Sequence, residues 1–265
     1  MKRSSADGAK SERRYELCGV NPILEALRAG RRTIEEITVA EGARNPHLNE
    51  LLDFARNQKI AVRHAPRAKL DREAGTNSHQ GVIARVSAAR YVDAEELLTS
   101  IELKIQSEQS PLIVLLDGVE DPRNFGAILR TADCAGVQAV FVPERRAVGL
   151  TDTVAKAAAG ALEHVPVARV TNLVRLIEQL KERKVWVVGT DAAGPSNYTE
   201  WDWTQPTAVV FGGEGSGLHR LVRERCDMLV RIPLQGHLES LNVSVAVGVV
   251  LFEALRWREA GPKPK

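Results

Sequence analysis

The chain has 265 residues, of which 44% are hydrophobic and 26% charged, with 36 basic against 34 acidic side chains. This composition is typical of a soluble globular protein and excludes a largely disordered chain, because the apolar content is high and the net charge is small. No apolar run reaches the roughly 18 residues of a membrane helix, and the polar N-terminus lacks the apolar region of a signal peptide.

The cysteines and the charge distribution further restrict the classes of protein that fit the sequence. Cys18, Cys134 and Cys226 form no CxxC pair, so we expect neither a zinc site nor a disulfide framework, and a reducing cytoplasm fits best. Residues 1–90 hold 17 basic and 11 acidic side chains, a net of +6, whereas residues 91–265 hold 19 and 23, a net of −4. This asymmetry is compatible with chance, but it also suggests that the N-terminal third faces a polyanion.

The first third of the chain reads as a small α/β domain. Asn21 is expected to cap a helix that continues through Pro22 and ends at Gly30. A second helix is expected at 45–58, strands are expected at 34–40, 60–62 and 81–86, and residues 63–72 look basic and turn-prone. We therefore expect a disordered tail over 1–14, a domain over 15–90, and a linker over 91–110 that holds a short helix at 94–103.

From residue 111 onward strands alternate with helices. Strands are expected at 112–116, 137–142, 185–188, 208–211 and 228–232, and helices at 126–135, 151–161, 173–183, 218–226 and 241–258. Such alternation predicts an α/β domain over 111–260 with a mostly parallel sheet covered on both faces.

Three polar segments, each following an expected strand, interrupt this apolar pattern. They are residues 117–132, 210–218 and 231–246. Open α/β sheets bind ligands at the carboxyl ends of their strands, so these segments are candidates for a site. Taken singly, each is also explained by a turn, a helix cap such as Ser240, or a glycine loop without function.

Two other kinds of site fit poorly. The glycines around Glu214 suggest a dinucleotide loop, but they lie near the C-terminus, and Asp227 comes too early to be the acidic partner that such a site needs. His219 and His237 flank the glycine segments without metal-ligand spacing, so we expect them to be structural and expect no metal site.

Taken together and in order, the three segments resemble the signature motifs of the SpoU (TrmH-type) RNA ribose methyltransferases of the SPOUT superfamily. The matching residues are Asn124-x-Gly126-x-x-x-Arg130-Thr131, Gly212-Gly213-Glu214-x-x-Gly217, and Ile232-Pro233-x-x-Gly236-x-x-x-Ser240-Leu241-Asn242-Val243-Ser244. The N-terminal third is similar to the substrate-binding domain of the bacterial enzymes that methylate a guanosine ribose in 23S rRNA, at Gly19-Val20-Asn21-Pro22-x-x-Glu25-Ala26-Leu27 and His79-Gln80-Gly81-Val82.

The resemblance implies a fold, a cofactor and partners. It implies that the C-terminal SPOUT domain holds a deep trefoil knot, that the N-terminal domain is L7Ae/L30e-like and binds RNA, and that helix 241–258 helps to form a homodimer. It also implies S-adenosylmethionine-dependent 2′-O-methylation of a 23S rRNA guanosine, either in naked rRNA or in an assembling large ribosomal subunit.

The resemblance also implies roles for single residues. Because a guanidinium does not readily lose a proton, we expect Arg130 to stabilise the developing oxyanion rather than to act as the base, although the base role stays open. The other catalytic candidates, which orient the substrate or hold the helix start, are Asn124, Glu214, Ser240 and Asn242. The expected cofactor-binding residues are Gly212, Gly213, Gly217, Ile232, Leu234, Gly236 and Leu241. The expected RNA-binding residues are Arg63, Arg67 and Arg72.

Three alternatives stay open. The same chemistry on tRNA or at another rRNA position would use the same motifs. A non-catalytic RNA-binding protein would be expected to lack Arg130, Asn124 or Asn242, and all three are present. A nicotinamide-dependent oxidoreductase is disfavoured by the position of the glycine loop.

Overall fold

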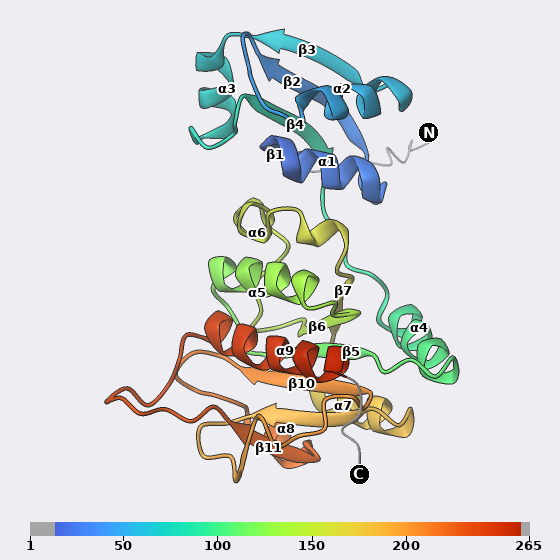
Figure 1. The fold of residues 1–265 in the computed structure, drawn as a ribbon, viewed down its shortest axis with the longest axis vertical. Coiled ribbons are helices and arrows are strands. Elements are labelled where there is room, and N and C mark those ends of the chain that lie inside the picture. The colour runs from blue at the N-terminus through green and yellow to red at the C-terminus, as the bar shows by residue number, and fades with distance from the viewer. Residues whose placement is uncertain (1–13, 261–265) are drawn as a thin grey trace, which may run out of the picture. The chain divides into compact units, whose positions relative to one another are not determined.

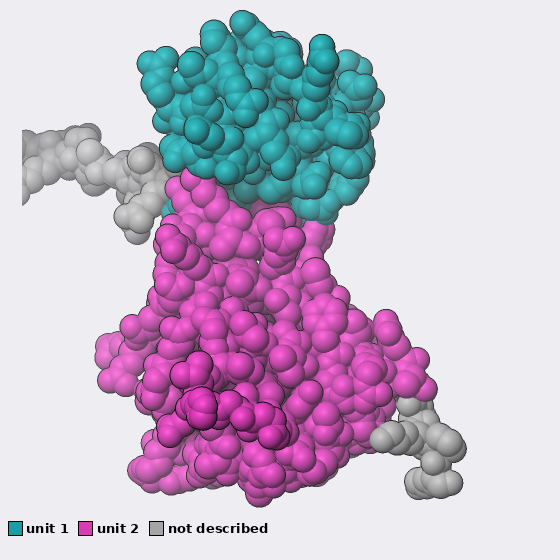
Figure 2. Space-filling view, turned by 60° about the vertical axis from the view of Figure 1, so that its left-hand side comes forward, with its two compact units in different colours: residues 1–89 teal, residues 90–265 magenta. Residues whose placement is uncertain are grey.

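The computed structural model describes residues 14–260, and the chain divides into two compact units, residues 1–89 and 90–265 (Figure 2). The first unit holds a four-stranded sheet in the order β1-β4-β2-β3, in which β4 runs antiparallel to β1 and β2, and β2 runs parallel to β3. Its elements are β1 (Arg14–Cys18), α1 (Val20–Ala29), β2 (Ile34–Ala40), α2 (Leu48–Asn57), β3 (Ala61–Ala65), α3 (Arg67–Ala74) and β4 (Val82–Ser87).

Three details of the first unit differ from the sequence-based expectation. Strand β1 begins at Arg14, inside the expected tail, and the rest of that tail lies outside the described residues. Helix α3 occupies most of the segment expected to be a turn. Asn21 does not cap α1, because the helix begins at Val20 and its N-cap is Gly19, whose φ of 99° is favourable only for glycine.

The second unit is built on a seven-stranded sheet in which every pair of neighbours is parallel (Figure 1). The spatial order is β7-β6-β5-β10-β8-β11-β9. The strands are β5 (Leu112–Asp117), β6 (Ala139–Pro143), β7 (Val167–Val170), β8 (Trp186–Thr190), β9 (Ser196–Asn197), β10 (Thr207–Gly212) and β11 (Met228–Arg231). The helices are α4 (Ala94–Gln106), α5 (Pro122–Cys134), α6 (Asp152–Ala158), the 3-10 turn η1 (Ala161–Glu163), α7 (Leu173–Glu182), α8 (Arg220–Arg225) and α9 (Val243–Ala260).

Helices cover both faces of this sheet. One apolar core joins the sheet to α5, α6 and α9, and a second joins its other face to α4, α7 and α8. Strand β5 is buried along its whole length, as expected for a central strand of a parallel sheet. The prediction of an α/β domain with a parallel sheet covered on both faces is therefore confirmed.

The expected linker is a packed part of the second unit. Val92 forms a parallel bridge with Ala168, and Leu97, Leu98 and Ile101 of α4 are buried in the second core. The apolar residues of α4 follow a polar stretch, and the sequence does not show that they pack against the sheet, so the segment was expected to be a linker.

The expected helix 151–161 ends earlier than predicted, because Ala159 adopts a left-handed φ of 51°.

A half-buried arginine holds the end of α9 in place. Arg258 donates to backbone carbonyl oxygens alone, and burial lowers its pKa to about 10. Its acceptors lie in the chain before β5 and before β10, on Ser110, Pro111, Trp203 and Gln205. Within residues 14–260, no helix has the length and apolar character to cross a membrane.

Candidate functional site

The three polar segments meet at the carboxyl edge of the parallel sheet. Strands β5 and β10 are neighbours, so α5 and the glycine loop of residues 212–219 leave the sheet side by side. Asp121 caps α5 by accepting hydrogen bonds from the backbone N–H groups of Arg123 and Asn124, each at 2.8 Å, and Pro122 occupies the first helical position. This cap fixes Asn124 in the first turn of α5, beside the glycine loop.

Asn124, Glu214 and Asn242 form one hydrogen-bonded group, which we call the amide–carboxylate network. Glu214 Oε1 accepts from Asn124 Nδ2 at 2.6 Å and from Asn242 Nδ2 at 2.9 Å, and the two asparagines are also joined at 3.1 Å. Asn242 Oδ1 in turn accepts from the backbone N–H of Ser244 at 2.9 Å and from its hydroxyl at 2.6 Å. The network thus joins residues that lie up to 118 positions apart in the sequence.

Close backbone contacts explain the glycines beside the network. A Cβ atom on Gly212 would lie 2.1 Å from the carbonyl carbon of Gly217, and one on Gly213 would lie 2.2 Å from the carbonyl oxygen of Gly118. Gly217 itself has a left-handed φ of 62°. At Gly212 and Gly213 no side chain fits without moving the backbone, and at Gly217 a side chain would be strained by the left-handed φ, so the close packing of this loop requires glycine at all three positions.

A cavity of about 650 Å³ opens beside the glycine loop. The loops after β8, β10 and β11 and the start of α9 line it. The expected site residues among its lining are Gly212, Gly213, Glu214, Gly217, Ile232, Leu234, Ser240, Leu241 and Asn242. Gly236 lies in the connection between β11 and α9, which is the long orange-red loop in Figure 1, and it is not part of the lining.

Sequence reasoning missed one wall of this cavity. Thr190, Asp191 and Ala192 line it, because the strand order places the end of β8 between β10 and β11. Burial alone would raise the pKa of Asp191, but the hydrogen bond from Arg223 Nε at 2.6 Å and the N–H of Ala193 outweigh it, and the pKa is lowered. The sequence feature that could have identified these residues is their position just after the expected strand at 185–188.

The charged side chains that line the cavity are all acidic. Asp191, Glu214 and Glu239 line it, and the described lining residues include no Lys, Arg or His. Such a cavity favours a ligand with positive charge, and it disfavours the pyrophosphate of a dinucleotide, which proteins usually bind through cations and free N–H groups at a helix N-terminus.

Two expected site residues take other positions. Arg130 lies exposed on α5, outside the lining, and within residues 14–260 it has no hydrogen-bond or ion-pair partner. Ser240 lines the cavity but does not cap α9, because Asn242 accepts the N–H of Ser244 and the helix begins at Val243. The expectation of a Ser240 cap is therefore wrong, and Asn242 fills that role as well as its place in the network.

The three arginines expected to bind RNA differ in their surroundings. Arg63 on β3 forms an ion pair with Glu36 at 2.8 Å. Arg67 and Arg72 are exposed on α3, and Arg72 Nε donates to the carbonyl oxygen of Ala68. Arg67 and Arg72 therefore offer more available positive charge than Arg63.

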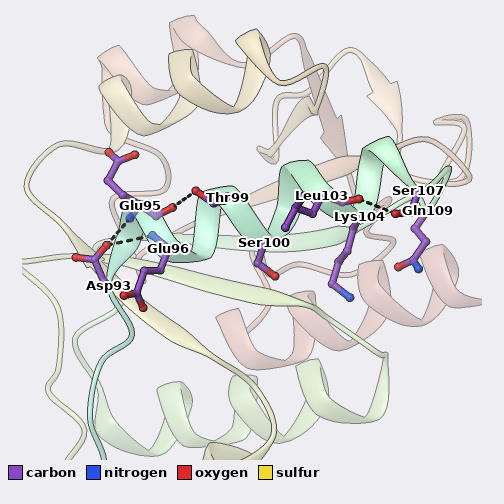
Figure 3. A pocket seen from close by; sticks show the side chains of 9 residues that line it. All are labelled: Asp93, Glu95, Glu96, Thr99, Ser100, Leu103, Lys104, Ser107 and Gln109. Carbon is purple, nitrogen blue, oxygen red and sulfur yellow. Dashed lines mark hydrogen bonds between the residues drawn. The ribbon is translucent and has the colours of Figure 1, made fainter.

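A second hollow lies along α4 (Figure 3). It follows one side of that helix, from Asp93 to Gln109, and none of the expected site residues lines it. Across the part of the chain that the structure describes, no group of three or more His, Cys, Asp or Glu side chains is placed to hold a metal ion.

Known proteins match both units. Residues 111–252 match the model of the SpoU rRNA Methylase family, and residues 17–92 match the model named RNA 2′-O ribose methyltransferase substrate binding. Bacillus subtilis YacO, which carries the name of a TrmH family tRNA/rRNA methyltransferase, is 43% identical over 248 residues, covering 94% of this chain and 98% of YacO.

Solved structures match over nearly the whole chain. AviRb, a SpoU methyltransferase from Streptomyces viridochromogenes solved in complex with AdoMet, matches with a TM-score of 0.76 and 26% identity over 96% of each chain. An AdoMet-bound rRNA methyltransferase from Sinorhizobium meliloti matches with a TM-score of 0.75 and 26% identity, over 92% of this chain and 87% of its own. With its two family matches and a relative of 43% identity, the chain belongs to the SpoU rRNA methylase family.

Proposed function

We propose that the protein transfers a methyl group from S-adenosylmethionine to the ribose 2′-hydroxyl of a guanosine in 23S rRNA. The observation that carries this proposal is the amide–carboxylate network, which joins the three family motifs at the rim of the acidic cavity. The AdoMet-bound solved structures of AviRb and the Sinorhizobium meliloti enzyme support the choice of cofactor.

The cavity residues fit S-adenosylmethionine by charge and by shape. Asp191, Glu214 and Glu239 suit its sulfonium and ammonium groups, and Gly212 and Gly213 contribute peptide groups to the lining. The apolar side chains of the lining, Ile232, Leu234 and Leu241, would hold the adenine ring. When bound, this cofactor supplies an electrophilic methyl group on positively charged sulfur.

The chain itself must orient the ribose and stabilise the charge on its oxygen. Arg130 has five N–H donors and no partner within residues 14–260, so its guanidinium is available to stabilise the 2′-oxygen as the hydroxyl proton passes to solvent water. Both amide N–H groups of the network converge on Oε1 of Glu214, which leaves Oε2 to orient a substrate or cofactor group.

The test is methyl transfer from tritiated S-adenosylmethionine to purified 23S rRNA, to a large-subunit assembly intermediate and to tRNA. We expect label in 23S rRNA or in the intermediate, mapping to one guanosine, and we expect Arg130→Ala to abolish transfer while cofactor binding persists. Label in tRNA alone would overturn the target and favour the second candidate, tRNA methylation, which the name of YacO also allows. No label in any RNA would overturn the activity and favour a non-catalytic RNA-binding role.

We further propose that the N-terminal unit, residues 15–90, binds the RNA and that α9 mediates a homodimer. The excess of basic side chains over residues 1–90 and the exposed Arg67 and Arg72 support the first part. Val245 and Phe252, seven positions apart on α9, are 51% and 50% exposed and support the second. Phe252→Glu should then give a monomer in analytical ultracentrifugation, and a wild-type monomer would overturn the dimer. The trefoil knot implied by the family resemblance stays a prediction.

A further inference from the structure

A single residue of β5 holds both ends of the glycine loop. Asp117, the last residue of β5, is only 4% exposed. Its backbone oxygen accepts from the N–H of Gly213 at 2.8 Å, and its carboxylate accepts from the backbone N–H of His219 at 2.7 Å and from Nδ1 of the same histidine at 2.9 Å. Between these two anchors runs the segment that lines the cavity.

The ring of His219 is held from two sides, and this fixes its proton. Arg146 Nη1 lies 3.2 Å from Nε2 of His219. A guanidinium can only donate, so Nε2 is the acceptor of this contact, and Nδ1 carries the N–H that is donated to Asp117. His219, which was expected from the sequence to be structural, therefore links the glycine loop to β5 and to the loop after β6.

This pair lies on the other side of the sheet from the amide–carboxylate network. Ile113 and Leu115 belong to the core with α8, and the alternation along β5 places the side chain of Asp117 on their face. Neither Asp117 nor His219 lines the cavity. Their effect on a ligand must therefore pass through the backbone of the glycine loop.

The loop needs such a restraint because of its composition. Gly213, Gly215 and Gly217 lie between the anchors, and the last two adopt left-handed φ angles of 79° and 62°. Glycine loses more conformational freedom on ordering than any other residue. If the loop were ordered only when a ligand arrives, that loss would weaken binding, whereas an already ordered loop avoids it.

We propose that Asp117 and His219 are a positioning pair that sets the affinity for the cofactor by holding residues 213–219 in the ligand-ready conformation. The proposal rests on the proposed function for the identity of the ligand, S-adenosylmethionine. It assigns the pair no contact with the reacting atoms, so it predicts an effect on cofactor affinity and none on the rate at saturation.

The test compares His219→Ala with His219→Asn, whose amide N–H can replace the Nδ1–H donor. We expect H219A to raise the dissociation constant for S-adenosylmethionine about tenfold in calorimetry, the equivalent of one charge-assisted hydrogen bond, with kcat at saturating cofactor within twofold of wild type. H219N should recover most of the affinity. Asp117→Asn should weaken binding at least as much, and if it fails to fold, the His219 variants alone decide.

Asp93→Asn is the control for Asp117→Asn, because each removes a carboxylate that accepts two N–H hydrogen bonds. Asp93 accepts from the backbone N–H groups of Glu95 and Glu96 at the start of α4, as Figure 3 shows, away from the glycine loop. We expect this variant to bind the cofactor as wild type does.

Hydrogen exchange of the ligand-free protein separates this proposal from the proposed function. Amides 213–218 should exchange faster in H219A than in wild type, H219N or D93N. Unchanged exchange, wild-type affinity in H219A, or an H219N as weak as H219A would overturn the positioning role. A wild-type protein that does not bind S-adenosylmethionine would overturn the proposed cofactor, and the exchange measurement would still decide the role of the pair.

Discussion

Replacing Glu214 by Gln should slow methyl transfer without disturbing the fold. The glutamine keeps the shape of the side chain and a carbonyl oxygen for the two asparagine amides, but it removes the negative charge that both amides contact, at 2.6 and 2.9 Å. Hydrogen bonds to charged groups contribute about 1.5–3 kcal/mol and neutral ones about 0.5–1.5 kcal/mol. The two bonds together therefore lose about 2 kcal/mol, which corresponds to about a 30-fold lower rate and is an upper value because the network is partly exposed to solvent.

The assay is the initial rate of methyl transfer to the RNA substrate, with the thermal unfolding midpoint measured in parallel. Glu120→Gln is the control, because it removes the same charge from an exposed residue two positions before α5 that makes no hydrogen bond to the network. E214Q should lose activity and unfold at a lower midpoint than wild type while remaining folded at the assay temperature, because the same hydrogen bonds stabilise the folded state. E120Q should change neither the rate nor the midpoint. A rate within threefold of wild type for E214Q would refute the argument that the network orients the reacting groups.

Three further results are expected. Arg258→Met should lower the free energy of unfolding by about 3 kcal/mol, because it removes the donor to the carbonyl oxygens of Ser110 and Trp203 at about 1–3 kcal/mol each, whereas Thr207 still donates to those of Pro111 and Gln205; a urea titration that shows a loss under 1 kcal/mol would contradict this. Burial raises the pKa of Cys226 to about 12, so at pH 8 iodoacetamide should modify the exposed Cys134 well before Cys226, and equal labelling rates in mass spectrometry would count against it. Arg67→Ala should weaken RNA binding and its salt dependence more than Arg63→Ala, because Arg63 is already paired with Glu36. Filter binding over a salt series measures the affinity and its salt dependence, and equal losses in the two variants would contradict this prediction.

Local sequence patterns predict helices and strands well where a pattern is compatible with only one kind of element. The apolar run of β5 is buried throughout, as a central parallel strand must be, and the helix expected from residue 151 starts there, with Thr151 as the N-cap of α6. Helix α3 was missed because its polar sequence has only two buried positions, Leu70 and Ala74, and follows a proline. Strand β7 was missed because Arg169 interrupts its short apolar run, whereas the expected strand of the same length at 185–188 is uninterrupted.

The site could be predicted only in part, because its assembly depends on strand order. The motifs placed Asn124, Glu214 and Asn242 at strand ends, and these residues are in contact. The wall that Asp191 contributes needs β8 to lie between β10 and β11, which no local pattern indicates. The hydrogen bonds between Asp117 and His219, 102 positions apart, depend on the same non-local pairing.

The pairing of β5 with β10 has a consequence for how the enzyme folds. Strands β5 to β7 (residues 112–170) are paired among themselves, and so are β8 to β11 (residues 186–231). Among the described strands, the two groups are joined by the pairing of Leu112 to Asp117 with Thr207 to Gly212. Asn124 comes from the first group and Glu214 from the second, and Asn242 arrives last in the chain. Non-local pairings of this kind form slowly. The lining of the cavity comes from the second group and α9 alone, whereas Asn124 reaches Glu214 through the pairing of β5 with β10. The ability of a refolding chain to methylate RNA should therefore emerge in the late step that completes the sheet.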